Sequence, residues 1–416
     1  MARNSSPLGE AVRAHRRTAG MSQERLAEES GLSVGTIRKI EQGGQARVDT
    51  LHQIARALGI ETSRLFAPDA PLPVAEDSTN RQVLAQLRQA LMPPVGIAAK
   101  ALVDPGEAVV LPEIRRSVED ALELYNSDRY DSVARILPGL LRTAEAATSA
   151  TGDEERHHEA VSVRGHALLL AGKYLTQVRQ YDMAYHAFVD GIRLARDLDD
   201  TLAATSGVTG LCWLLLRQDR FDEAEHLAAT TAEQIEPKFS IATTGQMAAW
   251  GELCLRIASA AVRNNRPDEA VEARRMAATA ASAVGTEHAD YRTHWARFGP
   301  VTVELKAVED LALVGDARGV LRRADDGLLS RSARRKIGRP SNINWNRHRL
   351  DVARAHVILG STQDAMDELV RVRATTGSWL QHQPMARYIM RDLLGTRKRT
   401  LTREMRDMAA HLNVHA

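Results

Sequence analysis

The chain contains little cysteine, few aromatic residues and almost no net charge. Its 416 residues include two cysteines and 4% aromatic residues, and the formal net charge is +2. Two cysteines cannot form a disulfide framework, and their scarcity fits a reducing cytoplasm. The low aromatic content, with Ala, Leu and Arg in abundance, favours helices over sheets. Because the chain as a whole is not polybasic, any surface that binds nucleic acid must be local.

Long apolar runs are missing as well. None approaches the ~18 residues needed to span a bilayer, and the N-terminal stretch MARNSSPLGE lacks the apolar core of a signal peptide. With 44% hydrophobic and 26% charged residues, the composition is that of a folded, soluble protein. We therefore expect a cytoplasmic protein without a membrane partner, divided into two or three domains of roughly 150 residues each.

Residues 8–66 predict a compact helical unit. Apolar residues recur there at helical spacing, and Gly20, Gly31 and Gly59 stand at plausible helix ends. Five short helices fit between these marks. The predicted unit is long enough to form a small domain with its own core.

The stretch MSQERLAEESGLSVGTIRKIEQGG (residues 21–44) places two of these helices around a glycine. Ser22 and Ser33 can cap the two helices, and Gly31 can adopt the left-handed conformation that a sharp turn needs. This is the arrangement of a helix-turn-helix, whose second helix enters the major groove of DNA. Two short helices around a glycine also occur in proteins that do not bind DNA, so the prediction depends on all five helices in order.

The outward face of the second helix carries the candidate contacts. Arg38 and Lys39 are long donors suited to guanine edges or phosphates, and Gln23 is placed to reach a phosphate. Over about 60 residues, the segment from LGEAVRAHRRTAG to GIETSRLF resembles the lambda-repressor-like (XRE/Cro) DNA-binding domains. The resemblance implies double-stranded DNA as the partner and recognition-helix contacts at Ser33, Val34, Gly35, Arg38 and Lys39. The full set of candidate DNA-binding residues also includes Gln23, Thr36 and Gln42.

The chain after this unit divides into a linker and a large helical region. The stretch APDAPLPVAEDSTN is rich in proline and polar residues, and the amphipathic run that follows it stops at Pro93. We expect a helix-turn-helix domain over residues 1–67, a linker with a connecting helix over 68–111, and a helical repeat domain over 112–416.

A weak repeat runs through the large region. The segments SDRYDSVARIL, VRQYDMAYHAF, QDRFDEAEHLA and NNRPDEAVEAR align, and two degenerate copies follow. We interpret each copy as a helical hairpin whose second helix is capped by the Asp, so that neighbouring hairpins must stack to cover their apolar faces. This resembles tetratricopeptide repeats, although the spacing exceeds the usual ~34 residues. The alternative is an irregular all-α domain. The landmark small residues are Val133, Ala184, Ala224, Ala270, Val320 and Ala365.

A curved array of hairpins offers a concave groove for a ligand. Proteins that join the two units resemble the peptide-pheromone receptors of the RRNPP type and a large actinobacterial set, which the stretch HWARFGPVTVELKAV also resembles. In both groups the array is taken to bind a signal and to dimerise. Core packing is the alternative for each Trp, and a helix cap for SNINWNR. The candidate ligand residues are Arg164, Trp213, Arg217, Trp250, Asn264, Trp295, Asn344, Asn346 and Arg347.

These patterns together predict an all-α protein, with a five-helix DNA-binding domain followed by a tetratricopeptide-like solenoid. We expect a homodimeric transcription regulator that binds an inverted-repeat operator and senses a peptide or a small molecule. A second hypothesis is a DNA-bound scaffold that recruits a protein partner without a small ligand. No catalytic, cofactor or metal motif is found in the sequence, so we expect neither enzyme activity nor a cofactor.

Overall fold

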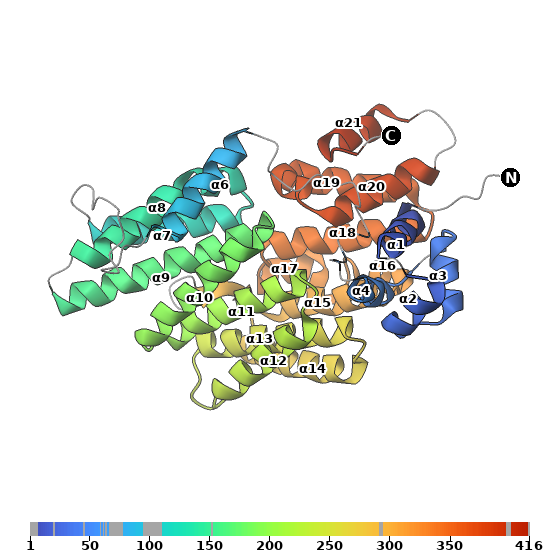
Figure 1. Cartoon of the computed structure of the whole chain (residues 1–416). Helices are drawn as coiled ribbons and strands as arrows, with labels where there is room; N and C mark the ends of the chain where they lie inside the picture. The colour runs from blue at the N-terminus through green and yellow to red at the C-terminus, as the bar shows by residue number, and fades with distance from the viewer. Residues whose placement is uncertain are drawn as a thin grey trace.

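The computed structural model describes most of the chain as α-helix, with one short two-stranded sheet (Figure 1). The all-α fold class is confirmed. Among the described helices, none combines the length and the apolarity required to cross a bilayer. The described residues are 7–19, 21–44, 46–58, 60, 62, 65, 78–94, 110–150, 153–290, 294–396 and 401–414.

The N-terminal domain consists of short helices around a small core. They are α1 (Pro7–Thr18), α2 (Gln23–Ser30), α3 (Val34–Glu41) and α4 (Val48–Ala57). Of the fifth helix expected from the sequence, Thr62 and Leu65 are described, and both are helical and buried. We call α1 to α4 with these two residues the head. Its core is formed by Leu8, Val12, Leu26, Ala27, Ile37, Ile40, Leu51, Ile54, Ala55 and Leu65.

Six helical hairpins follow and stack into an array. Their first helices contact one another in succession, because each hairpin leaves an apolar face that its neighbour covers. The pairs are α7 (Leu111–Asn126) and α8 (Tyr130–Ala150), α9 (Glu154–Gln177) and α10 (Tyr181–Asp197), α11 (Thr201–Arg217) and α12 (Phe221–Gln234), α13 (Thr244–Arg263) and α14 (Pro267–Val284), α15 (Pro300–Leu313) and α16 (Ala317–Arg323), and α18 (Asn342–Ile358) and α19 (Thr362–Gln381).

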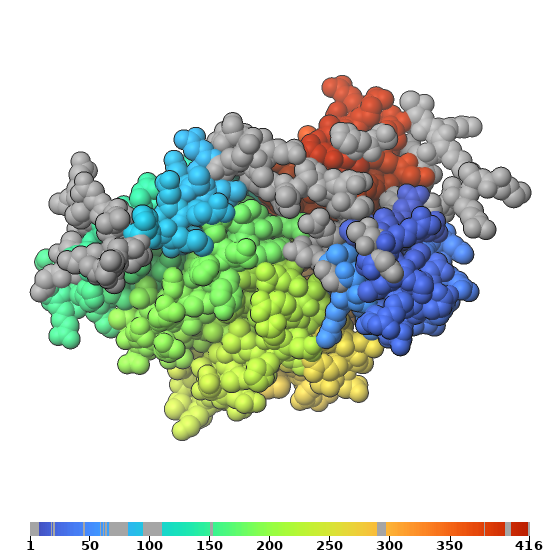
Figure 2. All heavy atoms as spheres, viewed as in Figure 1, coloured from blue at the N-terminus to red at the C-terminus, as the bar shows by residue number. Residues whose placement is uncertain are grey.

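Shorter elements complete the array. Helix α6 (Ser78–Leu91), which ends before Pro93, packs on α8 and α10 and buries Leu87 in the core of the first hairpins. Figure 2 shows the head as a lobe at one end of the molecule and α6 toward the other. The remaining elements are the 3-10 turn η1 (Gly327–Leu329), α17 (Arg331–Ile337), α20 (Pro384–Thr396) and α21 (Arg403–His411).

The six hairpin turns share one backbone conformation. In each, a residue with positive φ lies five positions before the small landmark residue, and the next N–H donates to the carbonyl five residues back. This bond satisfies an otherwise unpaired carbonyl at the end of the first helix. All six landmark residues are buried. The residues with positive φ are Asp128, Arg179, Asp219, Asn265, Gly315 and Gly360.

The structure corrects one expectation from the sequence and adds a short sheet. The aligned aspartates do not cap the second helices: in α10, for example, the cap position is Gln180 and Asp182 lies in the first turn. An acidic side chain there is stabilised by the helix dipole instead. The stretch HWARFGPVTVELKAV also begins as a strand, since β1 (His288–Asp290) pairs antiparallel with β2 (His294–Phe298). The ring of Phe298 fills the space that a side chain at Gly251 would occupy.

Candidate nucleic-acid interface and interior cavities

The turn between α2 and α3 has the geometry that its sequence predicts. The side chain of Ser22 accepts a hydrogen bond from the backbone N–H of Arg25, at 3.0 Å, and caps α2. Gly31 ends that helix with φ of 67°, a left-handed conformation that favours glycine. Ser33 then caps α3 by accepting from the N–H of Thr36, at 3.0 Å. The two helices are therefore fixed at a sharp angle to each other.

A buried carboxylate holds α3 against α1. Glu41 has no exposed surface, and it accepts hydrogen bonds from Arg16 Nε at 2.6 Å and from Gln23 Nε2 at 2.7 Å. Burial acts to raise the pKa of Glu41, but the bonds from Arg16 and Gln23 hold that pKa below its usual value. Arg16 was not among the predicted residues. The sequence does contain a signal for Arg16, because a charged Glu41 at an inward-facing position of α3 requires a buried cation as its partner.

The outward face of α3 does not pack against the head's core. Gly35, Arg38, Lys39 and Gln42 are exposed, whereas Ile37 and Ile40 are buried. A side chain at Gly35 would meet nothing closer than Ser33 Oγ, at 3.7 Å, so packing within the head does not require glycine there. Ser33 is exposed, and Val34 and Thr36 are half-buried beside it. This face can therefore enter a groove without rearrangement of the core.

Arg38 has partners on α2. Its Nε donates to Gln23 Oε1 at 3.2 Å, and its guanidinium pairs with Glu24 at 3.0 Å. Gln23 thus bridges the buried Glu41 and the exposed Arg38. Both members of the Arg38–Glu24 pair are exposed, so the pair is weak in water and a phosphate or a guanine can replace the carboxylate.

One attachment of the head to the array is a carboxylate in a hairpin turn. Asp219, in the α11–α12 turn, accepts hydrogen bonds from the backbone N–H of Thr62 at 2.6 Å and from its hydroxyl at 2.7 Å. His52 of α4 lies 3.4 Å from the same carboxylate, and its ring stacks edge-on against Phe221. Burial lowers the pKa of His52 although Asp219 acts to raise it. On the other side, Tyr388 of α20 packs against the head's core.

Two adjoining cavities lie along the first helices of the hairpins. The inner cavity, of about 130 Å³, is lined from α7, α9, α11, α13, α15 and α18. The head-side cavity, of about 200 Å³, is lined by Val48 and His52 of α4 together with α11, α13, α15 and α18. The residues common to both walls are Trp213, Arg256, Lys306 and Arg347.

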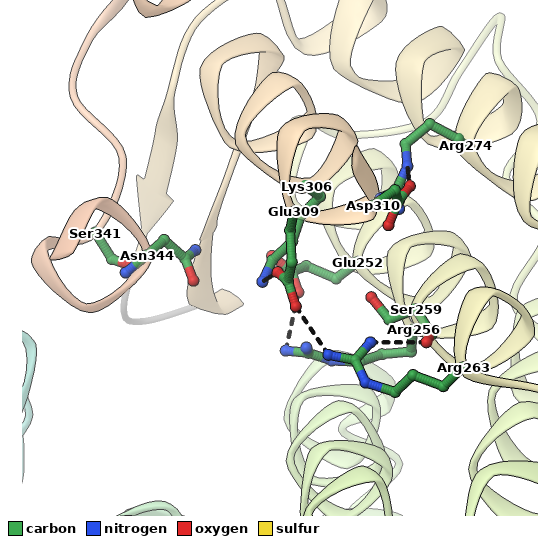
Figure 3. A network of polar contacts seen from close by, with 10 residues as sticks. All are labelled: Glu252, Arg256, Ser259, Arg263, Arg274, Lys306, Glu309, Asp310, Ser341 and Asn344. Atoms are coloured by element: carbon green, nitrogen blue, oxygen red, sulfur yellow. Dashed lines mark hydrogen bonds and ion pairs between the residues drawn. The ribbon is translucent and has the colours of Figure 1, made fainter. Parts of the chain in front are cut away.

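Charged side chains line the walls of both cavities. Figure 3 shows the network there: Arg263 of α13 donates to Glu309 of α15 at 2.9 Å, and Lys306 donates to the same carboxylate at 2.7 Å. Burial acts to raise the pKa of Glu309, but Lys306 and Arg263 hold it well below its usual value. Arg256 reaches Glu252 at 3.5 Å, a weaker contact.

Four of the nine predicted ligand residues line these cavities. Trp213 and Arg347 belong to both, Asn344 to the inner cavity and Arg217 to the head-side cavity. The guanidinium groups of Arg217 and Arg347 lie 5.4 and 5.9 Å from the centre of the Trp213 ring. The structure therefore brings these residues together from α11 and α18.

The other predicted ligand residues lie elsewhere. Trp250 is buried and packs edge-on against Phe239, while the side chain of Trp295 lies outside the described part of the chain. The remaining three have partners within the array: Arg164 pairs with Glu145, Asn264 donates to Asp222, and Asn346 donates to Asp128 and Thr376.

Several residues of the cavity walls were missed by the sequence analysis. On α13, Glu252, Arg256, Ser259 and Arg263 follow one another at spacings of three and four residues, and all line the cavities. Such spacing places polar groups on one helical face. A polar stripe on an otherwise buried helix was the available signal.

Comparison with known proteins supports the assignment of the head. A family model described as Helix-turn-helix matches residues 12–65, which include α2, α3 and α4. No match was found among curated proteins. The match supports a helix-turn-helix of the XRE type over residues 12–65 and, with it, a DNA-binding regulator.

Proposed function

We propose that the chain is a homodimeric, sequence-specific transcription regulator that binds an inverted-repeat operator and responds to a peptide or a small molecule held by the array. One observation carries the signal-sensing part. Helix α4 of the DNA-binding head supplies Val48 and His52 to the wall of a cavity inside the array. A molecule in that cavity contacts the head and the array at once.

Because the head and the array both contribute to the wall of this cavity, a bound ligand can affect the binding of DNA. A ligand shifts a conformational equilibrium by the difference in its affinity for the two states. A ligand in the head-side cavity has contacts with α4 in the docked state that it lacks when the head moves away. Its binding therefore changes the placement of the head. Occupants that add contacts to His52 favour docking, and larger occupants that displace α4 oppose it.

Dimerisation follows from the way such heads read DNA. One α3 covers half of an inverted repeat, so two heads related by a two-fold axis are needed for the whole site. We assign the dimer surface to the array over residues 112–416 and the operator contacts to the head over residues 1–67. Within the head, Arg38 and Lys39 read base edges or phosphates, and Gln23 orients Arg38.

Selection of bound DNA from a random pool tests this proposal. The full-length protein is used with and without culture extract from the producing organism. A symmetric motif whose recovery changes with extract supports a ligand-responsive dimer. A motif that is indifferent to extract favours the scaffold hypothesis, and an asymmetric half-site contradicts the dimer. A second selection with Asp219→Gly, which removes the carboxylate that docks the head, should abolish the response to extract without changing the half-site.

A further inference from the structure

The inner cavity combines an excess of positive charge with polar atoms that have no partner. Its walls carry five basic side chains against a single carboxylate, that of Glu252. The guanidinium of Arg347 lies against the Trp213 ring, and it interacts electrostatically with Glu309 and Asp351 of the adjoining cavity. Buried like charges repel one another unless a counter-charge is present. The cavity is therefore electrostatically suited to an anion.

Unsatisfied polar atoms in the same walls point to a ligand. Asn126 Nδ2, Gln177 Oε1, Thr209 Oγ1 and Arg256 Nε are all buried and lack a hydrogen-bond partner within the described part of the chain. Buried polar groups are paired in the great majority of cases, and each exception calls for an explanation. Four exceptions from α7, α9, α11 and α13 converge on one cavity.

The two buried amines that line the cavity both have lowered pKa values. Burial lowers the pKa of Lys173 to about 8; Glu252 acts to raise this pKa and Arg256 to lower it further. The pKa of Lys306 is also lowered by burial; Glu309 acts to raise it, whereas Arg347 and Arg256 act to lower it further. A bound anion would stabilise both ammonium groups.

We propose that the inner cavity is a binding site for a small organic anion, a molecule that carries a carboxylate or phosphate group. Arg256, Arg347 and Lys173 bind the anionic group, and Asn126, Gln177 and Thr209 bind the polar remainder of the molecule. This inference rests on the proposed signal-sensing function and names its ligand class. Because Trp213, Arg256 and Arg347 also form the wall of the head-side cavity, the anion contacts the groups that lead to α4.

Quenching of Trp213 fluorescence tests the charge of the cavity without DNA. Iodide, caesium and acrylamide are compared on the full-length protein, and the Trp213→Phe variant is subtracted to isolate Trp213. We expect iodide to quench Trp213 more strongly than caesium does, and Arg347→Gln to lower the iodide quenching about twofold or more. The matched control Arg275→Gln, on the exposed face of α14, should change nothing. Equal quenching by iodide and caesium would overturn the proposal.

Competition identifies the anionic group. Citrate and pyrophosphate are the carboxylate and phosphate probes, each compared with sodium chloride at equal ionic strength. Protection of Trp213 from iodide by either probe supports the site, and the more effective probe identifies the group. Failure of both overturns the assignment to carboxylate or phosphate. These experiments do not involve DNA. A negative result would therefore contradict the anion site without contradicting the proposed function as a transcription regulator.

Thr209→Val separates ligand binding from folding. The hydroxyl of Thr209 has no partner among the described residues, so its replacement by a methyl group should leave the melting temperature unchanged or raised. We expect the competition by citrate or pyrophosphate to weaken about 2- to 10-fold, since one hydrogen bond to the ligand is lost. Unchanged competition in this folded variant contradicts a role for Thr209 in the site.

Discussion

Asp219 accepts two hydrogen bonds from Thr62, a residue 157 positions earlier in the chain. The carboxylate belongs to a turn of the array, and the two donors belong to the DNA-binding head. His52 completes the contact at 3.4 Å and also lines the head-side cavity. The contact of the head with this turn thus depends on a few atoms that lie beside a candidate ligand site.

Removal of this carboxylate should release the head. Asp219→Gly keeps the left-handed turn, because glycine adopts positive φ without strain, and deletes both hydrogen bonds. Two bonds to a charged acceptor suggest a loss of about 2–4 kcal/mol in docking free energy. Hydrogen exchange should show faster exchange of the α4 amides.

Asp199→Gly is the matched control for this prediction. Asp199 has the same left-handed conformation in the α10–α11 turn, is exposed, and has no hydrogen bond or ion pair with the described residues of the head. Equal exchange of α4 in the wild type and in Asp219→Gly would show that other contacts, such as that of Tyr388, determine docking.

Arg38→Ala should weaken binding to the operator. Loss of one base contact in the major groove costs about 1–3 kcal/mol and relaxes the preference at one position. The dissociation constant and a repeated binding-site selection measure the two effects. An unchanged base preference would assign Arg38 to the phosphate backbone or to no contact.

Glu24→Gln provides the opposite change at the same place. It removes the carboxylate that pairs with Arg38 and one negative charge from the surface that faces DNA. We expect tighter binding and, because phosphate contacts release counterions, a measurable change in salt dependence. Weaker binding would mean that Glu24 orients Arg38 rather than competing with DNA.

Glu41→Gln should destabilise the head. It leaves the buried guanidinium of Arg16 without its counter-charge, which costs about 3–5 kcal/mol in unfolding free energy. The measurement is thermal or denaturant unfolding, followed at the head by hydrogen exchange. The exposed pair of Arg25 and Glu28 offers the control, since Glu28→Gln should cost less than about 1 kcal/mol.

Asp128 should make the array more stable at acidic than at neutral pH. Burial raises its pKa from the ordinary 3.8 to about 7, although hydrogen bonds from Tyr130 and Asn346 act to lower it. Between pH 4 and 7 the unfolded chain loses this proton while the folded protein keeps it, so stability falls as the pH rises and then levels off above 7. Asp128→Asn should match the wild type near pH 4 and gain on the order of 2 kcal/mol above pH 7.

Melting temperatures over this pH range measure the effect. The control is Asp199→Asn, at an exposed position with the same turn conformation. If both variants follow the wild-type profile, Asp128 does not hold a proton in the folded array.

The features that the sequence predicted best depend on local chemistry. The caps at Ser22 and Ser33 and the left-handed Gly31 involve neighbours within a few residues, so their spacing is sufficient. The buried landmark residues were found for the same reason, because each stands at a fixed distance from its own turn.

Features that join distant segments could not be predicted in this way. Nothing near Asp219 in the sequence indicates that Thr62 is its partner, and the polar stripe of α13 gains meaning once α11, α15 and α18 surround it. Trp250 shows a related limit. The sequence offered a groove position and core packing as alternatives, and in the structure its ring is buried beside the exposed Phe239.

The shared conformation of the six turns has a consequence for how such an array acquires new contacts. A left-handed backbone normally favours glycine, yet four of the six turns carry Asp, Arg or Asn there. Asp128 uses its side chain to accept from Asn346, and Asp219 uses its own to hold the head. Because the position recurs in each of the six turns, each turn presents one side chain that can form a contact outside its own hairpin. A substitution there can change the partner of a turn while its backbone conformation stays the same.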